Sequence, residues 1–234
     1  VGRDEDQTTR GRRAFADRAE HLGDPDYSDI PTDELIATCV DIGLTGIEGI
    51  SRKFYPAARK AGLEISLVGS HGFGKGPNDP ANHPMCIEKL IDGIDVAKQF
   101  DARRVITFVG METPGIDRDQ AIGNCVKAWK QVIGHAEKNG ITLCLELLNS
   151  VDDSHPMKGH PGYQGDDLDF CIEAIKQVGG ASLLEVYNGH PMTNVYGGPG
   201  KPGYDEIWDG VLSASRVIFG VATDDSHNYK DFHP

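Results

Sequence analysis

The sequence of 234 residues contains few cysteines and no long apolar run, and each shortage excludes a class of protein. Its five cysteines stand far apart and form no CxxC pair. That spacing disfavours both a disulfide framework and a structural zinc site on thiolates, and it suits reduced thiols in a reducing compartment. No apolar stretch approaches the roughly 20 residues of a transmembrane helix. We therefore expect a soluble protein without a membrane partner.

Basic residues are also scarce. The chain has 23 lysines and arginines against 36 aspartates and glutamates, which gives a formal net charge of -13. A protein that binds nucleic acid needs a basic surface to neutralise phosphates. We therefore expect no nucleic-acid partner. The expected partner is a small-molecule substrate, and assembly into a homo-oligomer stays open.

Residues 1–29 form a polar lead-in without the apolar core of a signal peptide, so we expect a cytoplasmic protein. The pair Arg12-Arg13 resembles the remnant of a twin-arginine leader, although charged residues interrupt the segment that should be apolar. Export therefore stays open as an alternative. No convincing strand candidate precedes Ile30, so the existence of a first barrel strand stays open.

From Ile30 onward, helical patterns alternate with short apolar runs, which is the rhythm of repeated βα units and a parallel sheet. The fold class predicted for residues 30–234 is therefore α/β, a single TIM-barrel-like domain of parallel (β/α) units. A full barrel needs eight strands and about 250 residues. Because only six strand candidates are clear, we predict an incomplete or distorted barrel. The candidates span residues 44–50, 63–73, 103–110, 141–149, 182–188 and 216–225.

Helices are predicted between these strands. One should begin with Thr32 as its N-cap, and another should end at Gly140. A third, over roughly residues 83–100, carries isoleucines, Leu90 and Ala97 at three- and four-residue spacing. That spacing predicts an apolar stripe that packs on a barrel wall.

Polar residues near the carboxyl ends of the strands are the candidates for chemistry, because the active sites of parallel α/β barrels gather there. Glu146 lies inside the apolar run ITLCLELLN, and Glu185 lies in the same way inside SLLEVYN. A bare carboxylate is costly to bury, so each glutamate needs a metal, a cation or several hydrogen-bond donors. The alternatives are a salt-bridged or helix-capping Glu146 and an edge-strand Glu185 that faces solvent.

A further acid and a histidine follow the last strand. Asp225 and His227 are two residues apart, so they point to the same side if the strand continues. With Glu146 and Glu185 they form a carboxylate and imidazole set suited to Mn²⁺ or Mg²⁺ and, as alternatives, to Zn²⁺ or Fe²⁺. We predict that the four side chains converge at one barrel mouth and share one divalent metal.

Four polar residues are predicted as substrate contacts: His71, His83, Asn149 and His160. His71 lies near the end of the second strand candidate, as Glu48 lies near the end of the first, and each is otherwise a hydrogen-bonded barrel residue. His83 starts a predicted helix and is otherwise a capping or surface histidine. His160 stands in a loop rich in glycine and proline, of the kind that closes over substrate, and is otherwise a solvated loop residue.

Several segments spread over about residues 32–179 together carry a resemblance to a known family. The most specific of these segments are CLELLNS at residues 144–150 and GHPGYQGD at residues 159–166. The set resembles the hydroxypyruvate isomerase branch of the xylose isomerase-like TIM barrels. The resemblance implies a divalent metal at the barrel mouth, held by acidic residues on late strands, and an aldose–ketose isomerisation of a small hydroxy-carbonyl compound. It aligns Glu146 with the family's first metal-binding and catalytic glutamate. We take Glu185 as the second catalytic residue.

The resemblance changes near residue 180. The segments LLEVYNGHP and VIFGVATDDSHNY, within residues 180–234, resemble the closing part of PHP-domain phosphoesterases, whose Asp-x-His ending matches Asp225 and His227. The last catalytic glutamate of the isomerases and the amino-terminal His-x-His of the phosphoesterases have no counterpart in this chain. The predicted function is therefore a metal-dependent isomerase. A metal-dependent phosphoesterase and an inactive barrel that binds a metal or a sugar are the alternatives.

Overall fold

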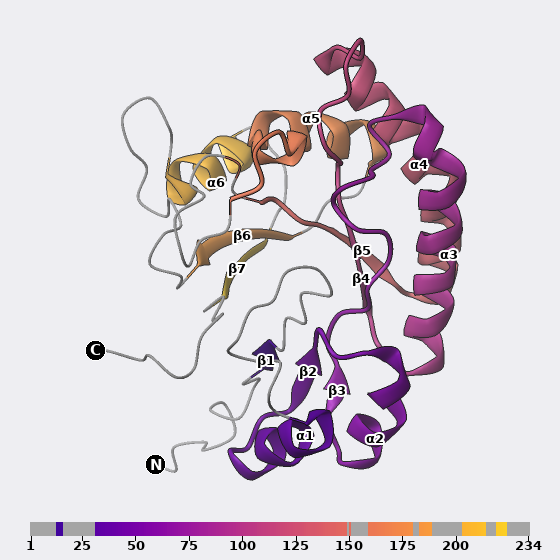
Figure 1. Cartoon of the computed structure of the whole chain (residues 1–234). Helices are drawn as coiled ribbons and strands as arrows, with labels where there is room; N and C mark the ends of the chain where they lie inside the picture. The colour runs from indigo at the N-terminus through magenta and orange to yellow at the C-terminus, as the bar shows by residue number, and fades with distance from the viewer. Residues whose placement is uncertain are drawn as a thin grey trace.

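The computed structural model describes residues 13–15, 31–148, 150, 159–179, 183–188, 203–213 and 219–223 of the chain (Figure 1). The strands are β1 (Arg13–Phe15), β2 (Gly46–Glu48), β3 (Glu64–Ile65), β4 (Arg104–Thr107), β5 (Thr142–Leu145), β6 (Leu183–Asn188) and β7 (Phe219–Thr223); for β1, β6 and β7 the backbone alone is described. The helices are α1 (Thr32–Asp41), α2 (Tyr55–Lys60), α3 (His83–Gln99), α4 (Arg118–Asn139), α5 (Leu168–Val178) and α6 (Tyr204–Ser213). Short 3-10 helices are η2 (Arg52–Phe54), η3 (Pro80–Asn82) and η4 (Gln164–Asp166).

The strand ladders are parallel, as repeated βα units require. β1, β2 and β3 form one ladder, β4 pairs with β5, and β6 pairs with β7. A parallel bridge between Val68 and Val105 joins the chain after β3 to β4. The first five strands therefore follow one another in sequence order, which is the topology of a parallel (β/α) barrel and confirms the predicted fold class. Within the described part of the chain, no ladder joins β5 to β6 or β7 to β1.

All six predicted strands are confirmed, each shorter than its candidate range. A strand for which the sequence offered no convincing candidate precedes Ile30, since β1 pairs with β2 from Arg13 opposite Gly46 to Phe15 opposite Glu48. Three residues are too few to show the alternation of apolar and polar side chains that marks a strand in a sequence. Pairing with β2 decides the conformation of this segment.

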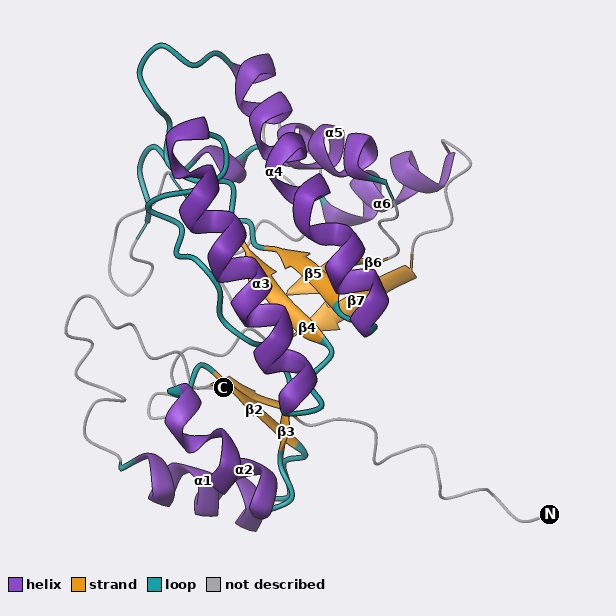
Figure 2. Cartoon of the chain, turned by 90° about the vertical axis from the view of Figure 1, so that its right-hand side faces the viewer, coloured by secondary structure: helices purple, strands orange, loops and turns teal. Residues whose placement is uncertain are grey.

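α3 and α4 lie side by side and cover the outer face of β4 and β5 (Figure 2). The predicted stripe on α3 is confirmed, since Leu90, Ile94 and Ala97 are fully buried. α4 ends at Asn139 with Gly140 as its C-cap, also as predicted. None of the described helices is both long enough and apolar enough to cross a membrane.

The predicted N-cap of the first helix is wrong by one residue. Thr32 is already helical, and the N-cap is Pro31, with φ -54° and ψ 134° and no side-chain capping bond. Proline fixes φ near this value and has no amide hydrogen to satisfy. The chain therefore turns into the helix at Pro31, and the hydroxyl of Thr32 is not needed as a cap.

The loop after β3 crosses the loop after β4 at Gly76, where the two backbones touch. The amide of Asn78 donates to the carbonyl of Val109 at 3.2 Å, and Gly76 is buried beside it. A β-carbon on Gly76 would collide with the carbonyl group of Val109 and the α-carbon of Gly110. Because the colliding atoms are backbone, the absence of a side chain at Gly76 sets how closely the two loops approach.

We expect Gly76→Ala to lower the free energy of unfolding by about 1–3 kcal/mol, since the added methyl group must push two backbones apart. The matched control is Gly134→Ala, on the exposed face of α4, where a β-carbon meets no atom within 4 Å. That change should raise stability by about 0.5–1 kcal/mol, because alanine loses less backbone entropy in a helix. Urea unfolding of both variants measures the difference, and equal stabilities would contradict the backbone contact.

Candidate functional site

Glu146, the residue directly after β5, lies where the β4–β5 ladder ends. Its amide donates to the carbonyl of Thr107 at 3.0 Å, which continues the ladder by one bond. The register ends with the pair Thr107 and Leu145, and the same register continued by one residue sets Glu146 opposite Phe108. Side chains of directly paired residues project to the same face of a sheet. Glu146 and Phe108 therefore share one face at the carboxyl ends of their strands.

Phe108 belongs to a group of rings that we call the aromatic wall, formed by Phe73, Phe108, His160 and Tyr163. The ring centre of Phe73 lies 4.4 Å from that of His160, 6.2 Å from that of Phe108 and 6.4 Å from that of Tyr163. The four residues come from three different loops or strand ends. Glu146, which is exposed, therefore lies on the same face of the sheet as Phe108, one member of the aromatic wall.

Tyr163 is the buried member of the wall, and its hydroxyl group contacts both strand ends. The hydroxyl accepts a bond from the amide of Val109 at 3.1 Å and donates to the carbonyl of Glu146 at 2.7 Å. Burial raises the pKa of this hydroxyl, and the nearby charge of Glu146 acts in the same direction. Tyr163 therefore stays protonated and remains a donor at ordinary pH.

His71 is buried behind the wall and takes part in a chain of hydrogen bonds. Its Nδ1 faces the carbonyl of Gly72 at 3.2 Å, so Nδ1 carries the proton. Its Nε2 lies 3.0 Å from Oγ1 of Thr107, which also accepts from the indole of Trp129 at 3.0 Å. This pattern assigns the hydrogen of the threonine hydroxyl to Nε2 of a neutral His71. Burial lowers the pKa of the imidazole, which agrees with the neutral form.

The other two predicted histidines differ in exposure. His160 is half-buried against Phe73, and burial lowers its pKa. His83 is buried and donates from Nε2 to the carbonyl of Pro77 at 2.9 Å, so it is not the surface residue of the alternative reading. Their roles as substrate contacts, like that of His71, stay predictions.

Glu48 ends β2 and is almost fully buried, with its carboxylate accepting a 2.6 Å bond from the hydroxyl of Ser66. Burial raises the pKa of Cys144 in β5 to about 11. Arg104 opposes that rise, whereas Glu146 and Glu48 add to it. Charges from Arg104 at the start of β4, from Glu48 in β2 and from Glu146 after β5 thus act on the same cysteine.

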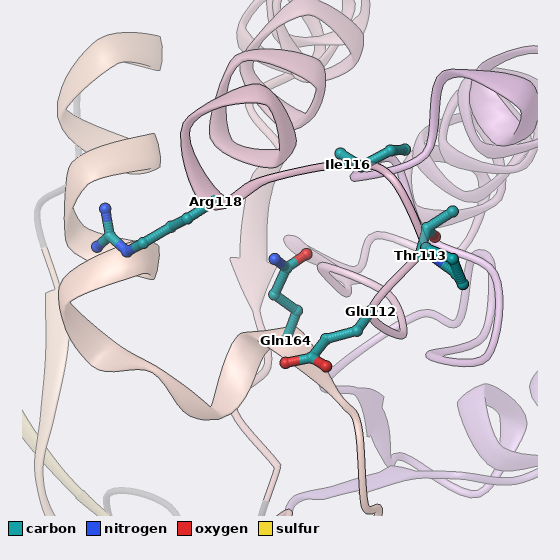
Figure 3. Close-up of a pocket in the computed structure, with 6 residues that line it drawn as sticks. Glu112, Thr113, Ile116, Arg118 and Gln164 are labelled. Carbon is teal, nitrogen blue, oxygen red and sulfur yellow. The ribbon is translucent and has the colours of Figure 1, made fainter.

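A separate depression of about 420 Å³ opens beside the loop after β4 (Figure 3). Its Arg118 extends toward α5, where it bonds Glu173 at 2.9 Å. Its Gln164 accepts a 2.9 Å bond from the side chain of Asn78. The depression is lined by Glu112, Thr113, Pro114, Ile116, Arg118 and Gln164.

A family model described as a xylose isomerase-like TIM barrel matches residues 34–187 of the chain. The chain belongs to this family. The match confirms the broader part of the resemblance found in the sequence. A comparison with curated proteins finds no match.

Solved structures resemble this xylose isomerase-like protein over most of its length. D-psicose 3-epimerase from Clostridium cellulolyticum H10, in a structure with D-tagatose, is 15% identical with a TM-score of 0.53 and covers 83% of this chain and 80% of its own. A D-tagatose 3-epimerase-like protein is 14% identical with a TM-score of 0.56, over 83% and 86%. An L-ribulose 3-epimerase is 15% identical with a TM-score of 0.50, over 80% and 73%. At these identities the likeness shows the shared fold.

The predicted metal ligands of this xylose isomerase-like barrel are only partly described. Asn149, Asp225 and His227 lie outside the described residues, and of Glu185 the structure gives the backbone, opposite Val221 in the β6–β7 ladder. Among the described side chains, no three acidic, histidine or cysteine residues are close enough to hold a metal. The four-ligand set therefore stays a prediction, with Glu146 as its described member.

Phe73, Phe108 and Tyr163 were not predicted as site residues from the sequence. Polar residues at strand ends indicate chemistry, whereas Phe73 and Phe108 follow β3 and β4 as apolar side chains. The motif GHPGYQGD contains Tyr163 and was the available signal. Its bonding to residues 17 and 54 positions earlier in the chain could not be found from the motif alone.

We expect the stability of this xylose isomerase-like barrel to depend on pH through His71. Burial lowers the pKa of His71 in the folded state below its ordinary value of 6.5. Just below pH 6.5, His71 therefore binds a proton in the unfolded chain but stays neutral in the folded chain. Stability is therefore complete above about pH 6.5 and is lost as the pH falls below it, by at most about 1.4 kcal/mol per pH unit.

Urea unfolding between about pH 7.5 and about pH 5, on the wild type and on His71→Gln, measures this contribution. Glutamine keeps one donor and one acceptor but does not titrate, so the variant should lose stability less steeply on acidification. Parallel curves for the two proteins would contradict a neutral, buried His71.

Proposed function

We propose that this protein interconverts isomers or epimers of a small hydroxy-carbonyl compound of the sugar type, with Glu146 as the residue that moves the proton. The observation that carries the proposal is the exposed carboxylate of Glu146 on the face of the aromatic wall, at the carboxyl ends of β4 and β5. Family membership supports it, as do the names of the similar structures, which are sugar 3-epimerases.

A carboxylate suits this chemistry because a hydrogen on a carbon next to a carbonyl group is weakly acidic. Glu146 would take that proton as a general base, and an enediolate would form as the electrons of the C–H bond move toward the carbonyl oxygen. Return of the proton to the neighbouring carbon, with the hydroxyl proton passing from one oxygen to the other, completes an isomerisation. In an epimerisation a second acid, for which we propose Glu185, would deliver a proton to the opposite face of the same carbon. A divalent metal, for which Mn²⁺ and Mg²⁺ are the first candidates, would polarise the carbonyl group. The residues that would hold this metal are Glu146, Glu185, Asp225 and His227.

The remaining residues of the mouth would bind the substrate. The rings of Phe73 and Phe108 offer an apolar surface to the C–H faces of a sugar, while His160 offers a polar edge to its hydroxyls. Two substrate classes fit the proposal. Hydroxypyruvate follows from the resemblance of residues 32–179, and neutral ketoses avoid placing a further anion near Glu48 and Glu146.

The test follows hydrogen exchange in D₂O with Mn²⁺ or Mg²⁺ present. Purified protein is incubated with hydroxypyruvate, D-psicose, D-tagatose or L-ribulose, and deuterium on the carbon next to the carbonyl is measured by NMR. Glu146→Gln should slow exchange and turnover by at least about 100-fold, because the amide cannot accept the proton. The control Glu137→Gln, which changes another exposed glutamate near the end of α4, should behave as the wild type.

Exchange that survives in Glu146→Gln would remove this residue from the role of base. No exchange with any of these compounds, together with turnover of an aryl phosphate and two or more metals per chain, would favour the phosphoesterase alternative. Binding of a metal or a sugar without any turnover, seen as a raised melting temperature, would favour the inactive barrel.

A further inference from the structure

The hydroxyl group of Tyr163 occupies a place in the β4–β5 ladder that a backbone bond would otherwise fill. In a parallel ladder, the bond from the amide of Glu146 to Thr107 is followed by one from the amide of Val109 to the carbonyl of Glu146. Here the hydroxyl of Tyr163 stands between these last two groups, accepting at 3.1 Å and donating at 2.7 Å. The two strand ends are therefore bridged by a side chain instead of being bonded directly.

The position of this bridge is fixed from both sides along its own segment. The amide of Glu112 donates to the carbonyl of Gly162 at 2.7 Å, and the amide of Gln164 donates to the carbonyl of Gly110 at 3.0 Å. These bonds flank Tyr163 and form an antiparallel bridge between it and Met111. The segment of residues 162–164 is thus held against the chain that follows β4.

The tyrosine ring is also fixed by its surroundings. Tyr163 is 1% exposed, and a β-carbon on Gly165 would lie 2.6 Å from Cε1 and 2.7 Å from the hydroxyl oxygen. The ring therefore rests directly on the backbone of Gly165 and cannot shift toward it. The backbone of Gly165 on one side of the ring and the two backbone bonds that flank Tyr163 together fix the position of its hydroxyl group.

We infer that Tyr163 is a positioning residue for Glu146: its hydroxyl bridge holds the ends of β4 and β5 apart and sets where the carboxylate stands at the barrel mouth. Glu146 lies one residue beyond β5, yet both its amide and its carbonyl are bonded, to Thr107 and to Tyr163. Because the amide and the carbonyl of Glu146 are both bonded, the position of its α-carbon and the direction in which its side chain leaves the backbone are fixed. The consequence for catalysis rests on the proposed function, whereas the placement of the carboxylate does not.

The experiment compares the wild type with Tyr163→Phe, which keeps the ring and removes the bridge. We expect kcat for the proposed reaction to fall by about 10–100-fold with KM changed by less than about threefold, because a base displaced by a fraction of an ångström still binds substrate but transfers the proton poorly. A purely structural tyrosine would lower the melting temperature without this split between kcat and KM.

A second readout needs no substrate. In protein with ¹³C-labelled glutamate, the side-chain carboxylate resonance of Glu146, identified by its loss in Glu146→Gln, should shift in Tyr163→Phe at about pH 8, where carboxylates are fully ionised. The amide of Val109 should exchange with solvent faster in the same variant. The matched control is Tyr55→Phe, which removes another buried tyrosine hydroxyl, beside Phe100. It should leave the resonance, the exchange rate and kcat unchanged.

An unmoved Glu146 resonance with a normal kcat in folded Tyr163→Phe would overturn the inference. A moved resonance in a protein whose wild type converts none of the compounds would support the positioning of Glu146 and reject the proposed function. If Tyr163→Phe does not fold, hydrogen exchange of the Val109 amide in the wild type tests the bridge instead. Slow exchange of the Val109 amide, comparable to that of Glu146, supports the bridge, and fast exchange overturns it.

Discussion

Thr107, the last residue of β4, holds three parts of the barrel mouth together through its backbone and its side chain. Its carbonyl accepts the amide of Glu146 from β5, and its hydroxyl links Trp129 of α4 to His71 in the loop after β3. The hydroxyl accepts the bond from Trp129 and donates the bond to His71. All of these groups are buried or end a ladder, so a missing partner would leave a polar atom without a bond.

Beyond Thr107 the two strands separate, and a side chain replaces the backbone at the point of separation. Strand ends that open in this way expose the residues that follow them, which here are Phe108 and Glu146. A carboxylate at such a point is not buried, so it needs neither a counter-charge nor a proton to be tolerated there. Glu48, in contrast, is buried and depends on the hydroxyl of Ser66. The mouth thus contains one buried carboxylate, that of Glu48, and one exposed carboxylate, that of Glu146.

Local signals were sufficient for the regular part of the chain. Each βα unit has its own apolar run and helical stripe, so six strands and the main helices could be recognised from residues a few positions apart. β1 was missed because its conformation depends on β2, about 30 residues later, rather than on its own three residues. The same limit applies to Pro31, where the entry of the chain into the helix replaced the expected threonine cap.

For the site, the sequence by itself determined that Glu146 stands at a strand end of a parallel barrel, because an apolar run interrupted by one acid is a local pattern. The tertiary structure decided which groups surround it. His71 meets Thr107 across 36 residues, and Tyr163 reaches Val109 across 54. Such contacts arise when neighbouring strands and their loops meet at one edge of a sheet, and no spacing within a single segment encodes them.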